Sequence, residues 1–95
     1  MSNSKTIKTG VIGTGYLGEF HIQQLQTISD VELVGFVESN PDRASAIGAK
    51  YNVQLYQKQS DLIGLCDAII IATPTVTHHT IANDALNNGC HVFIE

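Results

Sequence analysis

Three glycines, Gly13, Gly15 and Gly18, join an apolar run to a helical pattern in the segment GVIGTGYLGEFHIQQL. The run IKTGVIG predicts a buried strand, and residues 16–28 predict a helix. The stripe of that helix that faces the core is expected to hold Leu17, His21, Leu25 and Ile28. A strand that enters a helix through a glycine-rich turn is typical of parallel α/β sheets. The turn therefore restricts the chain to a small group of folds.

Strand and helix patterns alternate along the rest of the chain. Apolar, β-branched runs predict four further strands, over residues 31–37, 53–56, 67–73 and 91–95. Asn40 and Pro41 are the N-cap and the first residue expected of a second helix, and Gly89 suits the position that ends a later one. Residues 57–65 fit one or two helical turns.

Buried strands that alternate with helices predict an α/β fold, a three-layer, doubly wound parallel sheet of the Rossmann type. Right-handed crossovers would place its five strands in the order 3-2-1-4-5. The winding then reverses between strands one and four, so a ligand is expected at their carboxyl ends. The 95 residues are enough for one domain, spanning 1–95.

Composition excludes several classes of partner. The net charge is −4 and no basic block is present, so neither nucleic acid nor an anionic membrane surface is expected as a partner. The apolar run 68–72 is far too short to span a bilayer. Cys66 and Cys90 do not resemble a disulfide framework, and we expect buried, reduced thiols in a cytoplasmic protein. No metal site is expected.

The glycines predict a site for a dinucleotide. The N-terminus of a helix offers unpaired N–H groups and a positive dipole end, which a pyrophosphate can reach only where no side chain intervenes. Gly13 would allow the tight turn, Gly15 would let the backbone approach the pyrophosphate, and Gly18 would let the helix pack close to the strand. Spacing alone also fits an ordinary turn, so the rest of the chain has to supply the other parts of such a site.

An acid follows the second strand, where a dinucleotide site needs one. Glu38 comes directly after VGFV, and its carboxylate could accept both hydroxyls of the adenosine ribose. A carboxylate there would repel the 2′-phosphate of NADP, and the next residue, Ser39, is not cationic. Arg43 lies one turn into the following helix and could still reach the site. We therefore expect NAD as the cofactor, with NADP less favoured.

The second half of the chain carries a more specific signal. The segment ATPTVTHHTIANDAL looks like the A-T-P-x-x-x-H pattern, with its Ala-Leu helix end, of the Gfo/Idh/MocA family of NAD(P)-dependent oxidoreductases. The closing NNGCHVFIE is similar to that family's G-K-H-V-x-x-E-K-P, with Cys90 in place of the first lysine. With GVIGTGYLGEFH and GFVESNPDRA, the resemblance covers the whole chain.

The resemblance also implies roles for particular residues. Four residues after the fourth strand would line the cofactor between its pyrophosphate and its nicotinamide: Thr73, Pro74, Thr75 and His78. Glu95 would approach the nicotinamide ribose. Backbone N–H groups would bind the phosphates at Thr14, Tyr16 and Leu17.

In this family a lysine of the E-K-P motif lies beside the nicotinamide and takes part in catalysis. Glu95 matches the glutamate of the motif, so the lysine would follow it, and no catalytic residue is assigned within 1–95. The resemblance thus implies the cofactor domain of a longer oxidoreductase, without its C-terminal substrate domain and inactive alone. The whole enzyme would pass a hydride between nicotinamide and a small-molecule substrate, commonly a sugar or polyol.

Two other functions stay open on the sequence. One is a non-catalytic, NAD-sensing regulatory protein of the same fold, which need not keep the lysine after Glu95. A methyltransferase has a similar glycine-rich loop and acid, but its cofactor contains no pyrophosphate and it has no role for the TPxxxH segment. Residues 92–94 are expected to form an exposed apolar edge, so we also expect self-association into a homo-oligomer.

Overall fold

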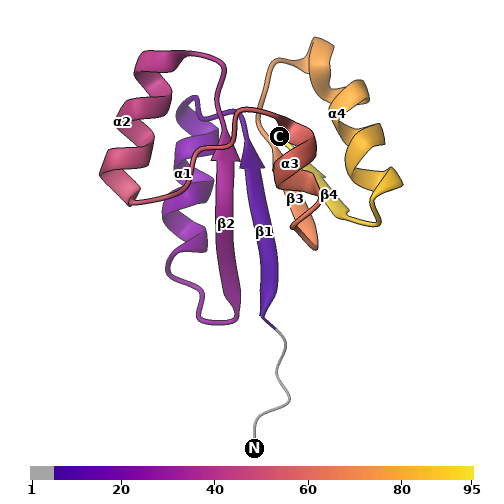
Figure 1. Ribbon diagram of the computed structural model, residues 1–95, viewed down its shortest axis with the longest axis horizontal. Coiled ribbons are helices and arrows are strands. Elements are labelled where there is room, and N and C mark those ends of the chain that lie inside the picture. The colour runs from indigo at the N-terminus through magenta and orange to yellow at the C-terminus, as the bar shows by residue number, and fades with distance from the viewer. Residues whose placement is uncertain (1–5) are drawn as a thin grey trace, which may run out of the picture.

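Four parallel strands form the centre of the protein in the computed structural model, which describes residues 6–95 (Figure 1). The elements follow one another along the chain as β1 (Ile7–Ile12), α1 (Tyr16–Leu25), β2 (Val31–Val37), α2 (Pro41–Tyr51), α3 (Gln59–Ile63), β3 (Ala68–Ile71), α4 (Thr75–Asn87) and β4 (His91–Ile94). The strand order is β2-β1-β3-β4, and each neighbouring pair is parallel. The predicted parallel α/β sheet of the Rossmann type is confirmed.

The prediction of five strands in the order 3-2-1-4-5 is wrong. Residues 53–56 form only an isolated bridge, between Leu55 and Phe36 of β2. The chain reaches this bridge through Asn52, which has a left-handed backbone with φ +54°, and soon turns into α3. Phe36 N donates to Gln54 O, and Tyr56 N donates to Phe36 O. This short passage allows no further pairing with β2. The other four strands keep their predicted relative order.

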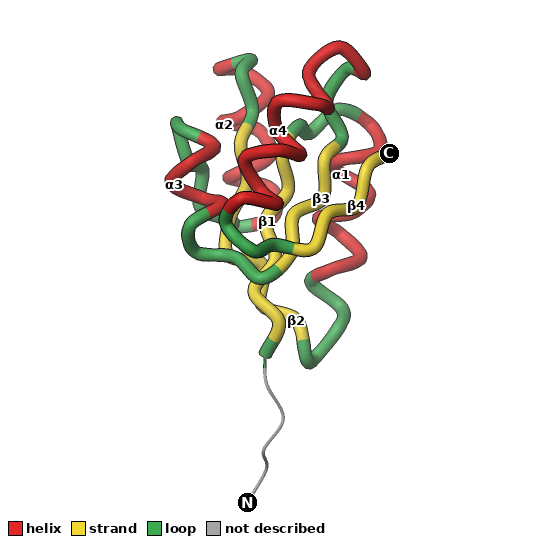
Figure 2. The backbone as a smooth tube through the Cα atoms, turned by 90° about the vertical axis from the view of Figure 1, so that its right-hand side faces the viewer, coloured by secondary structure: helices red, strands yellow, loops and turns green. Residues whose placement is uncertain are grey.

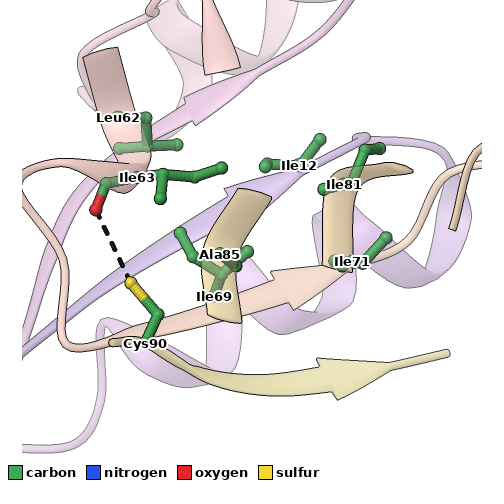
Figure 3. Close-up of a cluster of buried hydrophobic side chains, with 8 residues drawn as sticks. All are labelled: Ile12, Leu62, Ile63, Ile69, Ile71, Ile81, Ala85 and Cys90. Carbon is green, nitrogen blue, oxygen red and sulfur yellow. Dashed lines mark hydrogen bonds between the residues drawn. The ribbon is translucent and has the colours of Figure 1, made fainter. Parts of the chain in front are cut away.

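Helices cover both faces of the sheet and make three layers. One face holds Val11, Phe36 and Ile70 against Ile22 of α1 and Ile47 of α2. The other face packs against α3 and α4, and Figure 2 shows α1 and α3 on opposite sides of the strands. Figure 3 shows the cluster on this second face, whose members are Ile12, Leu62, Ile63, Ile69, Ile71, Ile81, Ala85 and Cys90. All four residues of β3 are buried, as the prediction of a strand apolar on both faces required.

The predicted apolar stripe of the first helix is only partly right, because Leu25 packs against the core but Leu17 and Ile28 do not. Leu17 and Ile28 are each 48% exposed, and α1 ends before Ile28, at Leu25. The buried residues of the helix are Gly18 and Ile22. A Cβ added at Gly18 would overlap the carbonyl oxygen of Gly13, so the helix turns its glycine toward the strand and approaches closely. The glycine spacing predicted this close approach at Gly18, whereas the predicted stripe left out Ile22, the buried residue four positions further on.

Several local predictions are confirmed. Asn40 is the N-cap of α2, its Oδ1 accepts a hydrogen bond from Arg43 N at 3.0 Å, and Pro41 is the first helical residue. Gly89 follows α4 with φ +78°. Both cysteines are free thiols as predicted, and Cys90 is buried, whereas Cys66 is only partly buried. Burial raises the pKa of Cys66 to about 12, so it stays protonated at neutral pH.

Within residues 6–95, no helix is long and apolar enough to cross a membrane. The same part of the chain contains no group of three or more His, Cys, Asp or Glu side chains placed to hold a metal ion.

Candidate functional site

An open groove of about 1130 Å³ lies at the carboxyl ends of β1, β2 and β3. Its volume is slightly above the range of about 300–1,000 Å³ that is usual for small-molecule sites. The floor comes from the ends of the strands, and the walls come from the turns that lead into α1, α2 and α4. The lining residues are Ile12, Gly13, Thr14, Gly15, Val37, Glu38, Ser39, Asn40, Arg43, Gln59, Ala72, Thr73, Pro74, Thr77, Thr80 and Ile81.

The turn between β1 and α1 forms part of this wall. Gly13 has φ +92°, and a Cβ there would lie 2.9 Å from both the carbonyl carbon and the oxygen of Ala72. Gly15 faces open space, with no atom within 4 Å of where its Cβ would stand. It is the N-cap of α1, and no side chain caps this helix. The glycines therefore leave the positive end of α1 bare toward the groove.

Glu38 accepts three hydrogen bonds, two of them from this turn. Its Oε1 accepts from the backbone N–H of Thr14 at 2.8 Å and from the Thr14 hydroxyl at 2.7 Å. Its Oε2 accepts from Asn40 N at 3.0 Å. The Thr14 N–H, predicted to bind a phosphate, is therefore engaged with Glu38 in this structure. Because each carboxylate oxygen can accept about two hydrogen bonds, Oε2 keeps capacity for a ligand.

Two opposing effects act on the ionisation of Glu38. Burial raises the pKa of its carboxyl group, while the hydrogen bonds from Thr14 and Asn40 and the nearby positive charge of Arg43 lower it. The lowering effects win, so the pKa lies below its ordinary value. Glu38 is thus a carboxylate at neutral pH and places a negative charge in the groove.

Arg43 crosses from α2 toward the glycine-rich turn. Its Nε donates to the carbonyl oxygen of Thr14 at 2.7 Å, and its Nη2 donates to Glu19 Oε1 at 2.6 Å. These two bonds hold the planar guanidinium by two of its nitrogens. Arg43 lines the groove, as the sequence suggested, but it is committed to protein partners.

Hydroxyl groups line the opposite wall. Thr73 follows β3, and its Oγ1 accepts from the hydroxyl of Thr77 at 2.7 Å. His78 Nε2 lies 2.6 Å from the carbonyl oxygen of Thr73, and because a carbonyl only accepts, that nitrogen carries the proton at this contact. The imidazole therefore braces the turn before α4 and does not line the groove.

Glu95 and His21 lie apart from the groove lining. Glu95 N donates to Ile71 O at 2.9 Å, which extends the pairing of β4 with β3. Its Oε2 is 3.3 Å from His21 Nε2 on α1, without hydrogen-bond geometry. The contact links the end of the sheet to the helix that carries the glycine-rich turn.

The structure thus gathers most, but not all, of the predicted residues around one groove. Eight of them line it: Gly13, Thr14, Gly15, Glu38, Ser39, Arg43, Thr73 and Pro74. Three form the first turn of α1 without lining the groove: Tyr16, Leu17 and Gly18. The side chain of Thr75 lies outside the part of the chain that the structure describes. His78 and Glu95 do not line the groove.

Some residues of the groove were not foreseen. Thr77, Thr80 and Ile81 of α4 all face it. Their spacing of three and four residues puts them on one face of a helix, and a threonine-rich face beside the predicted ligand edge was a usable signal. Gln59 was not predictable, because it comes from α3, which the sequence placed only loosely.

Comparison with known proteins agrees with this geometry. Residues 7–95 match the family described as "Oxidoreductase family, NAD-binding Rossmann fold", whose members include Gfo, Idh and MocA proteins. The chain belongs to the Gfo/Idh/MocA family. The match includes nearly the whole chain and therefore every element of the sheet.

Curated relatives are dehydrogenases. The chain is 38% identical over 89 residues to a UDP-N-acetylglucosamine 3-dehydrogenase of Acidithiobacillus ferrooxidans, covering 94% of this chain and 28% of that protein. It is 32% identical over 95 residues to inositol 2-dehydrogenase 3 of Saccharopolyspora erythraea, covering 95% and 28%. The chain therefore spans little more than a quarter of the length of these relatives.

Solved structures of other proteins also resemble the chain closely. A scyllo-inositol dehydrogenase from Lactobacillus casei with bound NAD(H) and scyllo-inositol superposes with a TM-score of 0.85 at 30% identity, over 95% of this chain and 28% of that one. A biliverdin reductase from Synechocystis in complex with biliverdin and NADP+ gives a TM-score of 0.90 at 26% identity, over 95% and 29%. The similar structures thus include both an NAD(H) complex and an NADP+ complex.

Proposed function

We propose that this chain is the NAD-binding domain of a larger dehydrogenase that acts on a sugar, a polyol or a related small molecule with a CH–OH group. The observation that carries the proposal is the glycine-rich turn, which leaves the uncapped N-terminus of α1 bare beside the carboxylate of Glu38. Membership of the family supports the nicotinamide cofactor, and the dehydrogenase relatives support the reaction class.

The residues fit a dinucleotide. A pyrophosphate needs N–H donors and a positive helix end without intervening side chains, and Gly15 offers open space at that point. The N–H groups of Tyr16 and Leu17 in the first turn of α1 are the proposed donors. Thr14 instead would act indirectly, by fixing the carboxylate of Glu38. The bound nicotinamide would supply a site that accepts or gives a hydride.

The charges of the groove favour NAD over NADP in this proposal. Glu38 is ionised and would accept the hydroxyls of the adenosine ribose, whereas it would repel a 2′-phosphate. Ser39 beside it carries no charge. Arg43, the cation that a 2′-phosphate would need, already donates to Thr14 and Glu19.

The opposite wall would hold the nicotinamide half of the cofactor. Thr73 and Pro74 line the groove there, and we extend this part of the proposal to Thr75 and His78, which follow them in α4. His78 would act by bracing the turn at Thr73. Glu95, at the end of β4, is the proposed neighbour of the nicotinamide ribose.

The substrate and its catalytic groups belong to the proposal for the whole protein. The relatives are named for UDP-N-acetylglucosamine and inositol, which are a sugar and a polyol. Because no catalytic residue is assigned within residues 1–95, we expect the chain alone to bind cofactor without turnover. We further propose a cytoplasmic location, with which two free thiols are consistent, and self-association into a homo-oligomer.

Calorimetric titration of the chain with NAD, NADP and S-adenosylmethionine tests the cofactor assignment. We expect NAD to bind more tightly than NADP, and S-adenosylmethionine to give no binding heat. Replacing Glu38 by Ala removes the acceptor for the ribose hydroxyls and is expected to weaken NAD about tenfold, the effect of about one charge-assisted hydrogen bond. Absence of NAD binding, or tighter binding of S-adenosylmethionine, would contradict the proposal.

A further inference from the structure

Glu19 is the centre of a charged cluster that lies outside the groove lining. It stands in the first turn of α1, and its carboxylate accepts three hydrogen bonds, all from α2. Arg43 Nη2 donates at 2.6 Å, Lys50 Nζ at 2.8 Å and the Tyr51 hydroxyl at 2.6 Å. The Glu19 side chain is only 20% exposed, so its carboxylate is largely covered by these partners and the two helices.

Arg43 is the member of this cluster that also reaches the groove. Among the residues within 6–95 that line the groove, it is the one lysine or arginine. Its positive charge lowers the pKa of Glu38, so the two side chains lie within electrostatic reach of each other. A cation is therefore present beside the carboxylate proposed to bind the adenosine ribose.

The position of this cation matters because NADP differs from NAD at one place. Its 2′-phosphate lies on the same ribose and needs a cationic N–H donor, a role for which a guanidinium is well suited. Nε is bonded to Thr14 O and Nη2 to Glu19, so the guanidinium is fixed against the turn with two of its five N–H donors engaged and cannot turn toward a phosphate without losing these bonds. Hydrogen bonds, first of all from Lys50, lower the pKa of Glu19 to about 2. Glu19 is therefore a carboxylate at neutral pH and attracts the positive charge of Arg43.

We propose that Glu19 is a positioning residue for cofactor choice, which holds Arg43 against the glycine-rich turn and so denies a 2′-phosphate its cation. The inference rests on the proposed cofactor function and adds a residue outside the groove lining to it. In this proposal Glu19 does not touch the cofactor. It acts through Arg43 alone, whereas Lys50 and Tyr51 only anchor its other oxygen, Oε2.

The test compares the dissociation constants of NAD and NADP for the wild-type chain and for Glu19→Ala, measured by calorimetry. Releasing Arg43 should improve NADP binding relative to NAD about tenfold, the value of one charge-assisted hydrogen bond. Glu19→Gln keeps the size of the side chain and one neutral acceptor, so it should shift the ratio in the same direction by less. In the double variant Glu19→Ala/Arg43→Ala, the gain for NADP should disappear.

Two matched controls separate this role from a purely structural one. Lys50→Ala and Tyr51→Phe each remove one donor to Glu19 but leave the bond between Glu19 and Arg43 in place. They should leave the ratio of the two dissociation constants unchanged. Loss of contact between α1 and α2 would weaken both cofactors alike, and thermal unfolding of each variant reports it separately.

The possible results distinguish a failure of the Glu19 inference from a failure of the proposed cofactor function. An unchanged ratio in both Glu19 variants, with NAD still bound, would overturn this inference and leave the proposed function standing. Loss of both cofactors in both Glu19 variants would assign Glu19 to the fold and also overturn it. Failure of the wild-type chain to bind either cofactor would overturn the proposed function and this inference with it.

Discussion

Gly13 and Gly15 stand two residues apart in one turn, yet their surroundings differ. Gly13 has a left-handed backbone, and a Cβ there would press against the backbone of Ala72 and the Cγ2 of Thr73. Gly15 has φ −65°, which any residue adopts, and open space around it. The first glycine is required by the fold, whereas the second is required only if something must approach the backbone.

The same substitution should therefore affect stability at Gly13 and cofactor binding at Gly15. Gly13→Ala is expected to lower the free energy of unfolding by about 1–3 kcal/mol, because of the strained backbone and the contact with Ala72. Gly15→Ala should change it by less than about 1 kcal/mol, the range of an N-cap exchange. It should nevertheless weaken NAD binding about tenfold, since the methyl group stands where the pyrophosphate would approach.

Urea unfolding and calorimetric titration of both variants check this pair. A Gly15→Ala variant that binds NAD as tightly as the wild type would show that the backbone there is not approached by the ligand.

At the residue scale, the sequence was sufficient to predict the shape of this turn. It was not sufficient to predict that Glu38 bonds Thr14, because the partner of a carboxylate depends on the distance between two loops 24 residues apart.

At the scale of helices and strands, the sequence predicted those features that neighbouring residues along the chain determine. The start of α2 was predictable because Asn40 and Pro41 specify it locally. The bridge at Leu55 was overestimated as a strand, since the number of paired residues depends on where the chain enters and leaves the sheet. The Glu19 cluster that joins α1 to α2 was not foreseen, because its three donors lie 24 to 32 residues from Glu19 along the chain.

That cluster predicts how the packing of α1 on α2 responds to acid. The pKa of Glu19 is about 2 in the folded protein against an ordinary value of 4.5. A lowered pKa means that the stabilisation is fully present above pH 4.5 and is lost as the pH falls toward 2. Urea unfolding as a function of pH should therefore show the free energy of unfolding falling across this interval, and falling less steeply in Glu19→Gln.

Lys50→Ala tests the cause of the lowered Glu19 pKa directly. The hydrogen bond from Lys50 is the largest cause of the lowered pKa of Glu19, so its removal should move that pKa upward. An NMR titration of the Glu19 carboxyl carbon measures the shift directly. Equal pH profiles for the wild type and Glu19→Gln would show that the cluster does not couple the two helices in solution.

Seen as a whole, the sheet has two edges of different character. At the β2 edge, residues 54–56 cover part of the strand through the bridge at Leu55. At the other edge, β4 pairs with β3 on one side, and no other strand within residues 6–95 pairs with it. Phe93 is 64% exposed and Ile94 51% exposed on this strand. An open, apolar edge strand is a template for pairing with another chain.

We therefore expect the chain to self-associate through β4, with a mean mass in light scattering that rises with concentration. Phe93→Lys places a charge on this edge and should shift the chain toward the monomer. Ile28→Lys is the matched control, because Ile28 is 48% exposed but belongs to the turn between α1 and β2, away from β4. A wild-type chain that stays monomeric at high concentration, or an equal response to both substitutions, would show that the exposed edge does not drive association.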